Sequence, residues 1–157
     1  MALATLARMS ISTIAFIGGG NMAGALIGGL RKSGRPASSI RVVEPFESQR
    51  ARLAQDFGVQ AQAAADASLA AAGLVVWAVK PQLFAEAAAP CRAHVGGALQ
   101  LSVMAGIPSA AIVRASGSAR VVRAMPNTPA LIGRGIAGLF ASDAVTAAER
   151  AEVEALL

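Results

Sequence analysis

Three consecutive glycines near the start of the chain have the spacing of a phosphate-binding turn. Gly18, Gly19 and Gly20 precede Asn21, Met22 and Ala23, which gives the pattern G-x-G-x-x-A after a short apolar segment. The first glycine of such a pattern permits a tight turn, the second lets the backbone approach a pyrophosphate, and the small last residue lets a helix pack on a sheet. The helix N-terminus offers N–H groups and a partial positive charge to the phosphates. The pattern therefore predicts a dinucleotide site between a strand and a helix.

An acidic residue, Glu44, ends the next apolar segment of the chain. At this place in a dinucleotide-binding fold, a carboxylate usually accepts hydrogen bonds from the adenosine ribose. A carboxylate there would also repel a 2′-phosphate, which favours NADH over NADPH. Arg50 and Arg52 follow closely and could offset that repulsion, and a solvated charge at a strand end is the alternative interpretation. The sequence therefore leaves the choice between the two cofactors open.

Three later segments place polar or small residues after expected strands. Residues 78–82 (AVKPQ) supply a cation, Lys80, and a proline that fixes the turn, and residues 102–107 (SVMAGI) supply small residues against which a cofactor could lie. Residues 123–130 hold Asn127 and Thr128 in a loop with two prolines. Ligands of open α/β sheets bind at the carboxyl ends of the strands. Taken singly, each segment could equally be a surface turn.

The elements that must position these residues alternate between short apolar runs and helix-like stretches. The expected strands are 13–18, 40–44, 74–79, 98–103, 120–124 and 135–140. The expected helices are 21–31, 47–57, 66–72, 108–114 and 146–157, together with one that has Pro81 in its first turn. Such alternation implies βαβ units. The sequence thus predicts an α/β fold of the Rossmann type, with a doubly wound, mostly parallel sheet and helices on both faces.

Composition argues against several other classes of protein. The chain of 157 residues has a formal net charge of +5, but its basic residues are scattered and no aromatic residues are interleaved with them, so a nucleic-acid partner is not expected. The uncharged stretch 9–30 is long enough to span a bilayer. Its three consecutive glycines, at 18–20, and Asn21 argue against a membrane helix. One His excludes a His cluster for a metal, and one Cys, Cys91, excludes an intrachain disulfide, which suits a cytoplasmic protein.

Four segments, taken in order, resemble the pyrroline-5-carboxylate reductase family. They are FIGGGNMAGALIGGL (16–30), AVKPQ (78–82), SVMAGI (102–107) and MPNTPA (125–130), within a resemblance that covers about residues 12–157. Enzymes of this family make L-proline from its cyclic imine. The resemblance implies NADP(H) or NAD(H) as cofactor, a cyclic imino acid as small-molecule substrate, no nucleic-acid or membrane partner, and a cytoplasmic location.

The resemblance also assigns site residues. Around the pyrophosphate it places Ile17, Gly18, Gly19, Gly20, Asn21 and Met22. Along the nicotinamide half it places Ala78, Val79, Lys80, Pro81, Val103, Met104 and Ala105, with Asn127 beside the active cleft. Glu44 joins these cofactor-binding residues through its place at a strand end. No catalytic residue is assigned, because hydride transfer to a protonated imine needs mainly orientation and exclusion of water.

Family members continue into an all-helical second domain that forms the dimer and supplies most contacts to the imine. We therefore expect residues 1–11 to be an N-terminal extension. Residues 12–157 should form an NAD(P)-binding domain that ends in the first part of a helix toward a missing helical domain, with the apolar face of that helix exposed. A homo-oligomer is expected only with that second domain. At residues 64–66 and at Gly73 the sequence departs from the family, which puts the adenine-side contacts in doubt. Two alternatives remain, an NAD(P)-sensing module without chemistry and a related imine or 3-hydroxyacid reductase.

Overall fold

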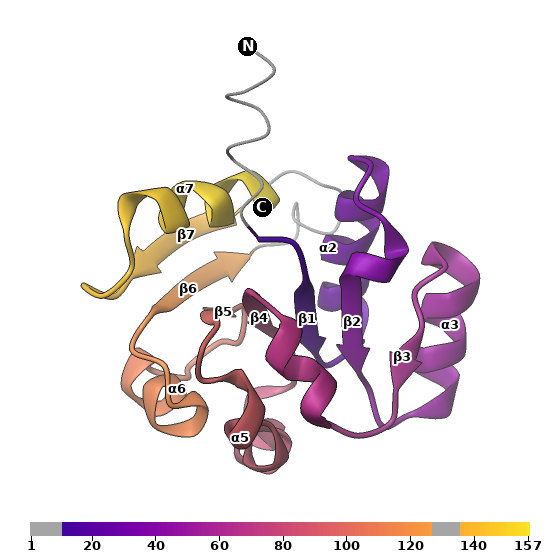
Figure 1. The fold of residues 1–157 in the computed structure, drawn as a ribbon, viewed down its shortest axis with the longest axis horizontal. Coiled ribbons are helices and arrows are strands. Elements are labelled where there is room, and N and C mark those ends of the chain that lie inside the picture. The colour runs from indigo at the N-terminus through magenta and orange to yellow at the C-terminus, as the bar shows by residue number, and fades with distance from the viewer. Residues whose placement is uncertain (1–10, 127–135) are drawn as a thin grey trace.

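The computed structural model describes residues 11–126 and 136–157. Within them lies one seven-stranded sheet with the order β3-β2-β1-β4-β5-β6-β7 (Figure 1). Its strands are β1 (Ile14–Ile17), β2 (Ile40–Val43), β3 (Ala61–Gln62), β4 (Leu74–Trp77), β5 (Leu99–Ser102), β6 (Val121–Pro126) and β7 (Ile136–Ala141). All neighbouring pairs are parallel except β6 and β7, which are antiparallel. The predicted Rossmann-type α/β fold is confirmed.

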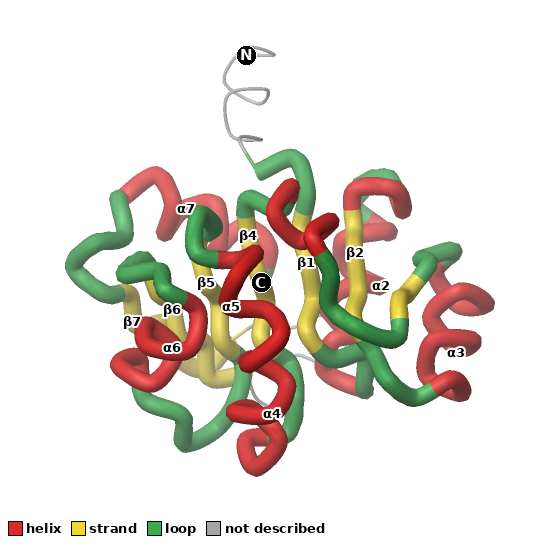
Figure 2. The backbone as a smooth tube through the Cα atoms, turned by 60° about the horizontal axis from the view of Figure 1, so that its bottom comes forward, coloured by secondary structure: helices red, strands yellow, loops and turns green. Residues whose placement is uncertain are grey.

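Helices cover both faces of this sheet (Figure 2). The α-helices are α2 (Asn21–Lys32), α3 (Glu47–Phe57), α4 (Phe84–Ala88), α5 (Arg92–Val95), α6 (Ser109–Ser116) and α7 (Ala147–Leu156). Short 3-10 turns are η1 (Ala37–Ser39), η2 (Ala67–Ala71), η3 (Pro81–Leu83) and η4 (Ala89–Cys91). Buried residues of α2, α3 and α7 share one core cluster with the sheet, and those of α4, α5 and α6 share another.

Alternation along the strands explains the two clusters. Ile14 and Phe16 of β1 lie in the cluster beneath α2, whereas Ala15 and Ile17 lie in the opposite one. Successive side chains of a strand point to opposite faces, and a strand covered on both faces reads as a continuous apolar run. The same rule explains the apolar sequence of β4, all of which is buried.

The observed elements differ from the expected ones in two instructive places. The short strand β3 was not predicted, because a two-residue strand of Ala61 and Gln62 has no apolar pattern of its own. The strand expected over 74–79 ends at Trp77, and residues 78–80 form the loop that follows. Pro81 then occupies the first turn of η3, as expected.

The final helix, α7, packs onto the domain. Thr146 and Glu149 form a capping box at its N-terminus, and Glu149 also pairs with Arg120. Val153 is fully buried in the core cluster that includes α2, and Leu156 packs against the same cluster. The expectation of an exposed apolar face on this helix is met only in part: Val153 and Leu156 pack on this domain's own core, whereas the alanines at 148, 151 and 155 are exposed and line a cavity.

Among residues 11–126 and 136–157, no helix combines the length and the apolar character needed to cross a bilayer. The uncharged stretch that resembled a span instead contains β1, the glycine turn and most of α2.

Candidate cofactor site

The glycine turn lies where the order of strands reverses direction. β1 pairs with β2 on one side and with β4 on the other, and ligands of open α/β sheets bind outside the carboxyl ends of strands at such a switch point. Gly18, the first residue after β1, has a positive φ of 101°, and a Cβ added to it would lie 2.6 Å from the Ala78 carbonyl oxygen. The turn therefore lies directly against Ala78 and Val79, and only glycine fits at this position.

The N-terminus of α2 is open toward this edge. Its N-cap residue is Gly20, no side chain caps the helix, and its first turn contains no acidic residue. Arg31 and Lys32 lie in its last turn, where they complement the negative end of the helix dipole. The first-turn N–H groups thus remain available to an anion, and this arrangement fits the pyrophosphate of a dinucleotide.

Glu44 lies buried beneath the glycine turn. Only 5% of the surface of this residue is exposed. One carboxylate oxygen, Oε1, accepts a hydrogen bond from the Gly19 N–H at 2.9 Å, and Oε2 accepts one from the Phe46 N–H at 2.9 Å. The interpretation of Glu44 as a solvated charge is therefore wrong, and its carboxylate joins the turn after β1 to the turn after β2.

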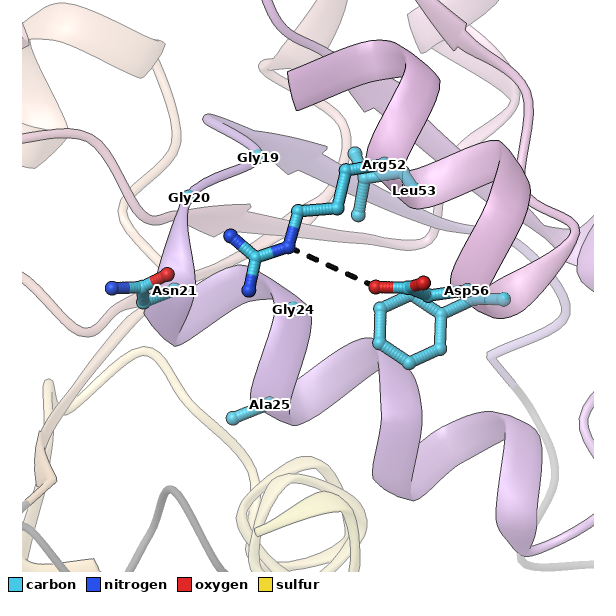
Figure 3. Close-up of a pocket in the computed structure, with 9 residues that line it drawn as sticks. Gly19, Gly20, Asn21, Gly24, Ala25, Arg52, Leu53 and Asp56 are labelled. Carbon is cyan, nitrogen blue, oxygen red and sulfur yellow. Dashed lines mark ion pairs between the residues drawn. The ribbon is translucent and has the colours of Figure 1, made fainter. Parts of the chain in front are cut away.

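The two arginines that follow β2 have different surroundings. Arg50 donates through Nη1 to the carbonyl oxygens of Glu44 and Pro45, at 3.0 and 2.8 Å, and so holds the turn after β2. Arg52 is largely exposed and lies 3.7 Å from the Asp56 carboxylate. Figure 3 shows the Arg52 guanidinium over a pocket of about 210 Å³ beside the glycine turn. The pocket is lined by Gly19, Gly20, Asn21, Gly24, Ala25, Arg52, Leu53, Asp56 and Phe57.

The segments assigned to the nicotinamide half follow β4 and β5, which are neighbours. Ala78 and Val79 are half-buried, whereas Lys80 and Pro81 are exposed. Lys80 is the N-cap residue of η3, and its carbonyl oxygen accepts the Leu83 N–H. The arrangement offers a small apolar surface next to one cation.

After β5 the chain is held by a backbone hydrogen bond and by the Ser102 hydroxyl, which accepts the Met104 N–H at 3.2 Å. The Val103 N–H donates to the Trp77 carbonyl oxygen at 3.1 Å. Met104 is buried in the core cluster beneath α4, α5 and α6, so it presents backbone rather than side chain to the edge, whereas Ala105 is exposed. Asn127 lies outside the described residues, and its assignment stays a prediction.

Sequence reasoning missed two polar contacts that shape this region. One is the bond between Gly19 and Glu44, which are 25 residues apart. The other is the buried bond from the Trp77 indole N–H to the Gln100 side-chain oxygen, at 2.8 Å. Neither has a local sequence signal, although a buried strand that contains a glutamine, as β5 does, indicates a partner for it.

Other candidate reactive groups lie away from this edge. Burial raises the pKa of the Cys91 thiol to about 11, which makes it a poor nucleophile. Among the residues that the structure describes, no three His, Cys, Asp or Glu side chains gather in a way that could hold a metal ion.

Comparison with known proteins assigns the family. Residues 13–106 match the family described as "NADP oxidoreductase coenzyme F420-dependent". The chain belongs to this family. The matched residues run from β1 to the turn after β5, so they include the glycine turn, Glu44 and both segments assigned to the nicotinamide half.

Individual relatives are more specific. Pyrroline-5-carboxylate reductase of Pseudomonas aeruginosa is 44% identical over 153 residues, which are 95% of this chain and 55% of that protein. The Haemophilus influenzae enzyme is 45% identical over 135 residues, 85% of this chain and 49% of that protein. The resemblance seen in the sequence is thus confirmed. The chain spans about half the length of these curated relatives.

Solved structures agree with this comparison. A pyrroline-5-carboxylate reductase from Coxiella burnetii matches with a TM-score of 0.85 and 31% identity, over 94% of this chain and 56% of that one. The Plasmodium falciparum pyrroline carboxylate reductase, whose crystal structure has NADP bound, matches with a TM-score of 0.77 over 94% of this chain and 54% of that one. At 20% identity, this second match shows the fold alone.

Proposed function

We propose that this chain is the cofactor-binding part of a pyrroline-5-carboxylate reductase, which reduces 1-pyrroline-5-carboxylate to L-proline with NAD(P)H. The observation that carries the proposal is the contact of the glycine turn with residues 78 and 79 at the switch point, in a chain 44% identical to such an enzyme. The family description also names coenzyme F420. We favour imine reduction because the relatives that match most of the chain are pyrroline-5-carboxylate reductases.

In this proposal the residues of the chain bind and orient rather than react. The first-turn N–H groups of α2 would hold the pyrophosphate, and Gly18 would let the turn lie directly against residue 78. Residues 78–81 and 103–105 would border the nicotinamide, and Asn127 would lie beside the cleft. Bound NAD(P)H would supply the hydride for the imine carbon. No side chain of the described residues is assigned a proton transfer.

We assign the remaining functions of such an enzyme to the part of the relatives that this chain does not match. Because they are about twice as long, we propose that imine contacts and the interface of a homo-oligomer belong to the remaining part of such proteins. Residues 12–157 would then be the NAD(P)-binding domain, after an extension of residues 1–11. The substrate would be a cyclic imino acid, and the setting cytoplasmic, without nucleic-acid or membrane partners.

Calorimetric titration of the chain with NADPH and with NADH tests the proposal. We expect saturable binding of at least one of them at one site per chain. A second measurement joins this chain to the remaining C-terminal part of the Pseudomonas aeruginosa relative and follows imine reduction. Binding without reduction in that chimera would favour an NAD(P)-sensing module, and absence of binding in both proteins would contradict a cofactor site.

A further inference from the structure

Glu44 occupies the place where a ribose-binding carboxylate is expected, yet its surroundings are those of a structural acceptor. The residue is 5% exposed. Each carboxylate oxygen already accepts a backbone N–H at 2.9 Å, one from Gly19 and one from Phe46. Hydrogen bonds in which a carboxylate accepts backbone N–H groups are among the stronger ones in proteins.

The contact also determines the shape of the glycine turn. A Cβ built on Gly19 would lie 2.8 Å from Cδ1 of Leu53 and 3.3 Å from Cβ of Glu44. The Gly19 backbone is therefore packed directly onto these two side chains, with its N–H directed to the Glu44 carboxylate. Since this N–H is engaged inside the protein, the donors left for a pyrophosphate are those of the first turn of α2.

Hydrogen bonds also connect Glu44 to the start of α3. Phe46 is the N-cap residue of α3, and its N–H donates to Glu44. Arg50, one turn into α3, donates to the carbonyl oxygens of Glu44 and Pro45. Hydrogen bonds thus hold the segment from Glu44 to the first turn of α3 in place. The Glu44 carboxylate also connects this segment to the glycine turn.

We propose that Glu44 is a positioning residue that holds the glycine turn in its binding geometry, and that it does not select NADH over NADPH. The inference rests on the proposed function, because it concerns the same cofactor site. The inference predicts two effects that must occur together. Changes at Glu44 weaken both dinucleotides alike, and they loosen the Gly19 and Phe46 backbone even when no cofactor is present.

The test compares Glu44→Gln with Glu47→Gln. Glu47 is an exposed residue at the start of α3, so its substitution removes the same charge close to the same turn. In Glu44→Gln the side-chain oxygen can accept one N–H, but the new NH₂ group faces the other donor. We expect Glu44→Gln to lower affinity for NADPH and NADH by about tenfold each, with the ratio of the two affinities changed less than about threefold.

Amide hydrogen exchange in the cofactor-free chain supplies a readout independent of binding. Exchange at Gly19 and Phe46 should accelerate at least about tenfold in Glu44→Gln and stay unchanged in Glu47→Gln. Amides inside β1 should remain protected in both variants, which shows that the fold persists. Glu44→Asp retains the charge on a shorter side chain, and it should show the same two effects as Glu44→Gln.

Two results would overturn the proposal. One is a shift of about tenfold or more in the affinity ratio toward NADPH in Glu44→Gln, which is what loss of a ribose-binding carboxylate produces. The other is unchanged exchange at Gly19 and Phe46. If the unsubstituted chain binds neither dinucleotide, the proposed function fails, and the exchange rates still decide whether Glu44 positions the turn.

Discussion

The two halves of the candidate site are built differently. On the phosphate side, the turn after β1 is fixed by contacts from segments distant in sequence: the Gly18 N–H donates to the Val43 carbonyl oxygen, and the Gly19 N–H to the Glu44 carboxylate. On the nicotinamide side, Val79 is half-buried and Lys80 exposed. The loops there are held by backbone hydrogen bonds at strand ends and by the Ser102 hydroxyl, which accepts the Met104 N–H at 3.2 Å, rather than by a buried carboxylate.

The difference follows from what each half must recognise. A pyrophosphate is bound by several N–H groups that must all point to one place, so their geometry has to be set before the ligand arrives. A nicotinamide ring needs a flat surface and exclusion of water, which small residues can provide together with groups from elsewhere. Substitutions should therefore have large effects on the phosphate side and small ones on the nicotinamide side.

The largest effect is expected from Gly18→Ala. The residue has a positive φ, and the added methyl group would lie 2.6 Å from the Ala78 carbonyl oxygen, so the turn must move. We expect the free energy of unfolding to fall by about 3 kcal/mol and dinucleotide affinity to fall by about a hundredfold or more. Denaturant titration and calorimetry measure the two quantities.

Gly34→Ala is the matched control for this substitution. Its φ of 99° is nearly the same, but a Cβ there meets no atom within 4 Å. It should lower the free energy of unfolding by only about 1 kcal/mol and leave dinucleotide affinity unchanged. Equal effects of the two substitutions would show that backbone strain alone, and not contact with residue 78, matters at Gly18.

Removing the buried hydrogen bond between Gln100 and Trp77, beneath the nicotinamide side, should affect stability more than dinucleotide binding. Gln100→Leu removes the acceptor of the buried Trp77 indole N–H and the side-chain donor to the Val95 and Ala98 carbonyl oxygens. Both carbonyls keep another donor, so the main loss is the unsatisfied indole N–H, which costs about 2 kcal/mol. Thermal unfolding should detect this loss, while dinucleotide affinity changes less than about threefold. Gln55→Leu, at an exposed position of α3, is the control. A larger loss of binding than of stability would mean that Trp77 sets the geometry of residues 78–81.

The N-terminus of α7 supplies a reference substitution whose effect should appear in the pH dependence of stability and not in cofactor binding. Burial alone would raise the pKa of Glu149, but hydrogen bonds from Thr146 and the nearby Arg120 charge outweigh it and hold this pKa below its ordinary value of 4.5. A carboxyl group whose pKa is lower in the folded than in the unfolded state stabilises the protein above about pH 4.5. That stabilisation is lost as the pH falls through the folded-state pKa.

Glu149→Gln should remove this pH-dependent contribution, about 1 kcal/mol for a partly exposed group. Denaturant unfolding of both proteins at pH 7 and pH 3 measures it, and the difference between them should be smaller at pH 3. Dinucleotide affinity at pH 7 should be the same in both, because α7 lines a cavity with Leu30 and Ser33 at the C-terminal end of α2, the opposite end of that helix from the glycine turn. An equal difference at both pH values would contradict the assignment.

The smallest effect is expected from Lys80→Met. Lys80 is exposed, and the hydrogen bond that it contributes to η3 comes from its backbone carbonyl. Removing its charge should change dinucleotide affinity less than about threefold, as measured by calorimetry. A loss approaching that of Gly18→Ala would end the distinction between the two halves, because it would place a specific phosphate contact on the nicotinamide side.

Local patterns predicted most of the fold because most of its elements carry their own signal. The apolar runs of β1 and β4, the glycine turn and the capping box of α7 all depend on residues a few positions apart. The role of Glu44 could not be predicted in this way. Its carboxylate accepts from Gly19, and only the parallel pairing of β1 with β2 brings the two together. Likewise, β3 exists because β2 offers it an edge, rather than because its own residues favour a strand.

The buried environment of Trp77 has a spectroscopic consequence. The chain has one Trp and no Tyr, so its ultraviolet-excited emission comes from a single indole. That indole is fully buried, hydrogen-bonded to Gln100, and packed edge-on against Phe84 with ring centroids 5.3 Å apart. Trp77 is also the residue directly before Ala78. The emission should therefore be blue-shifted and homogeneous, and a reduced nicotinamide seated beyond the end of β4 would quench it by resonance energy transfer, which makes the unlabelled chain its own optical sensor of occupancy.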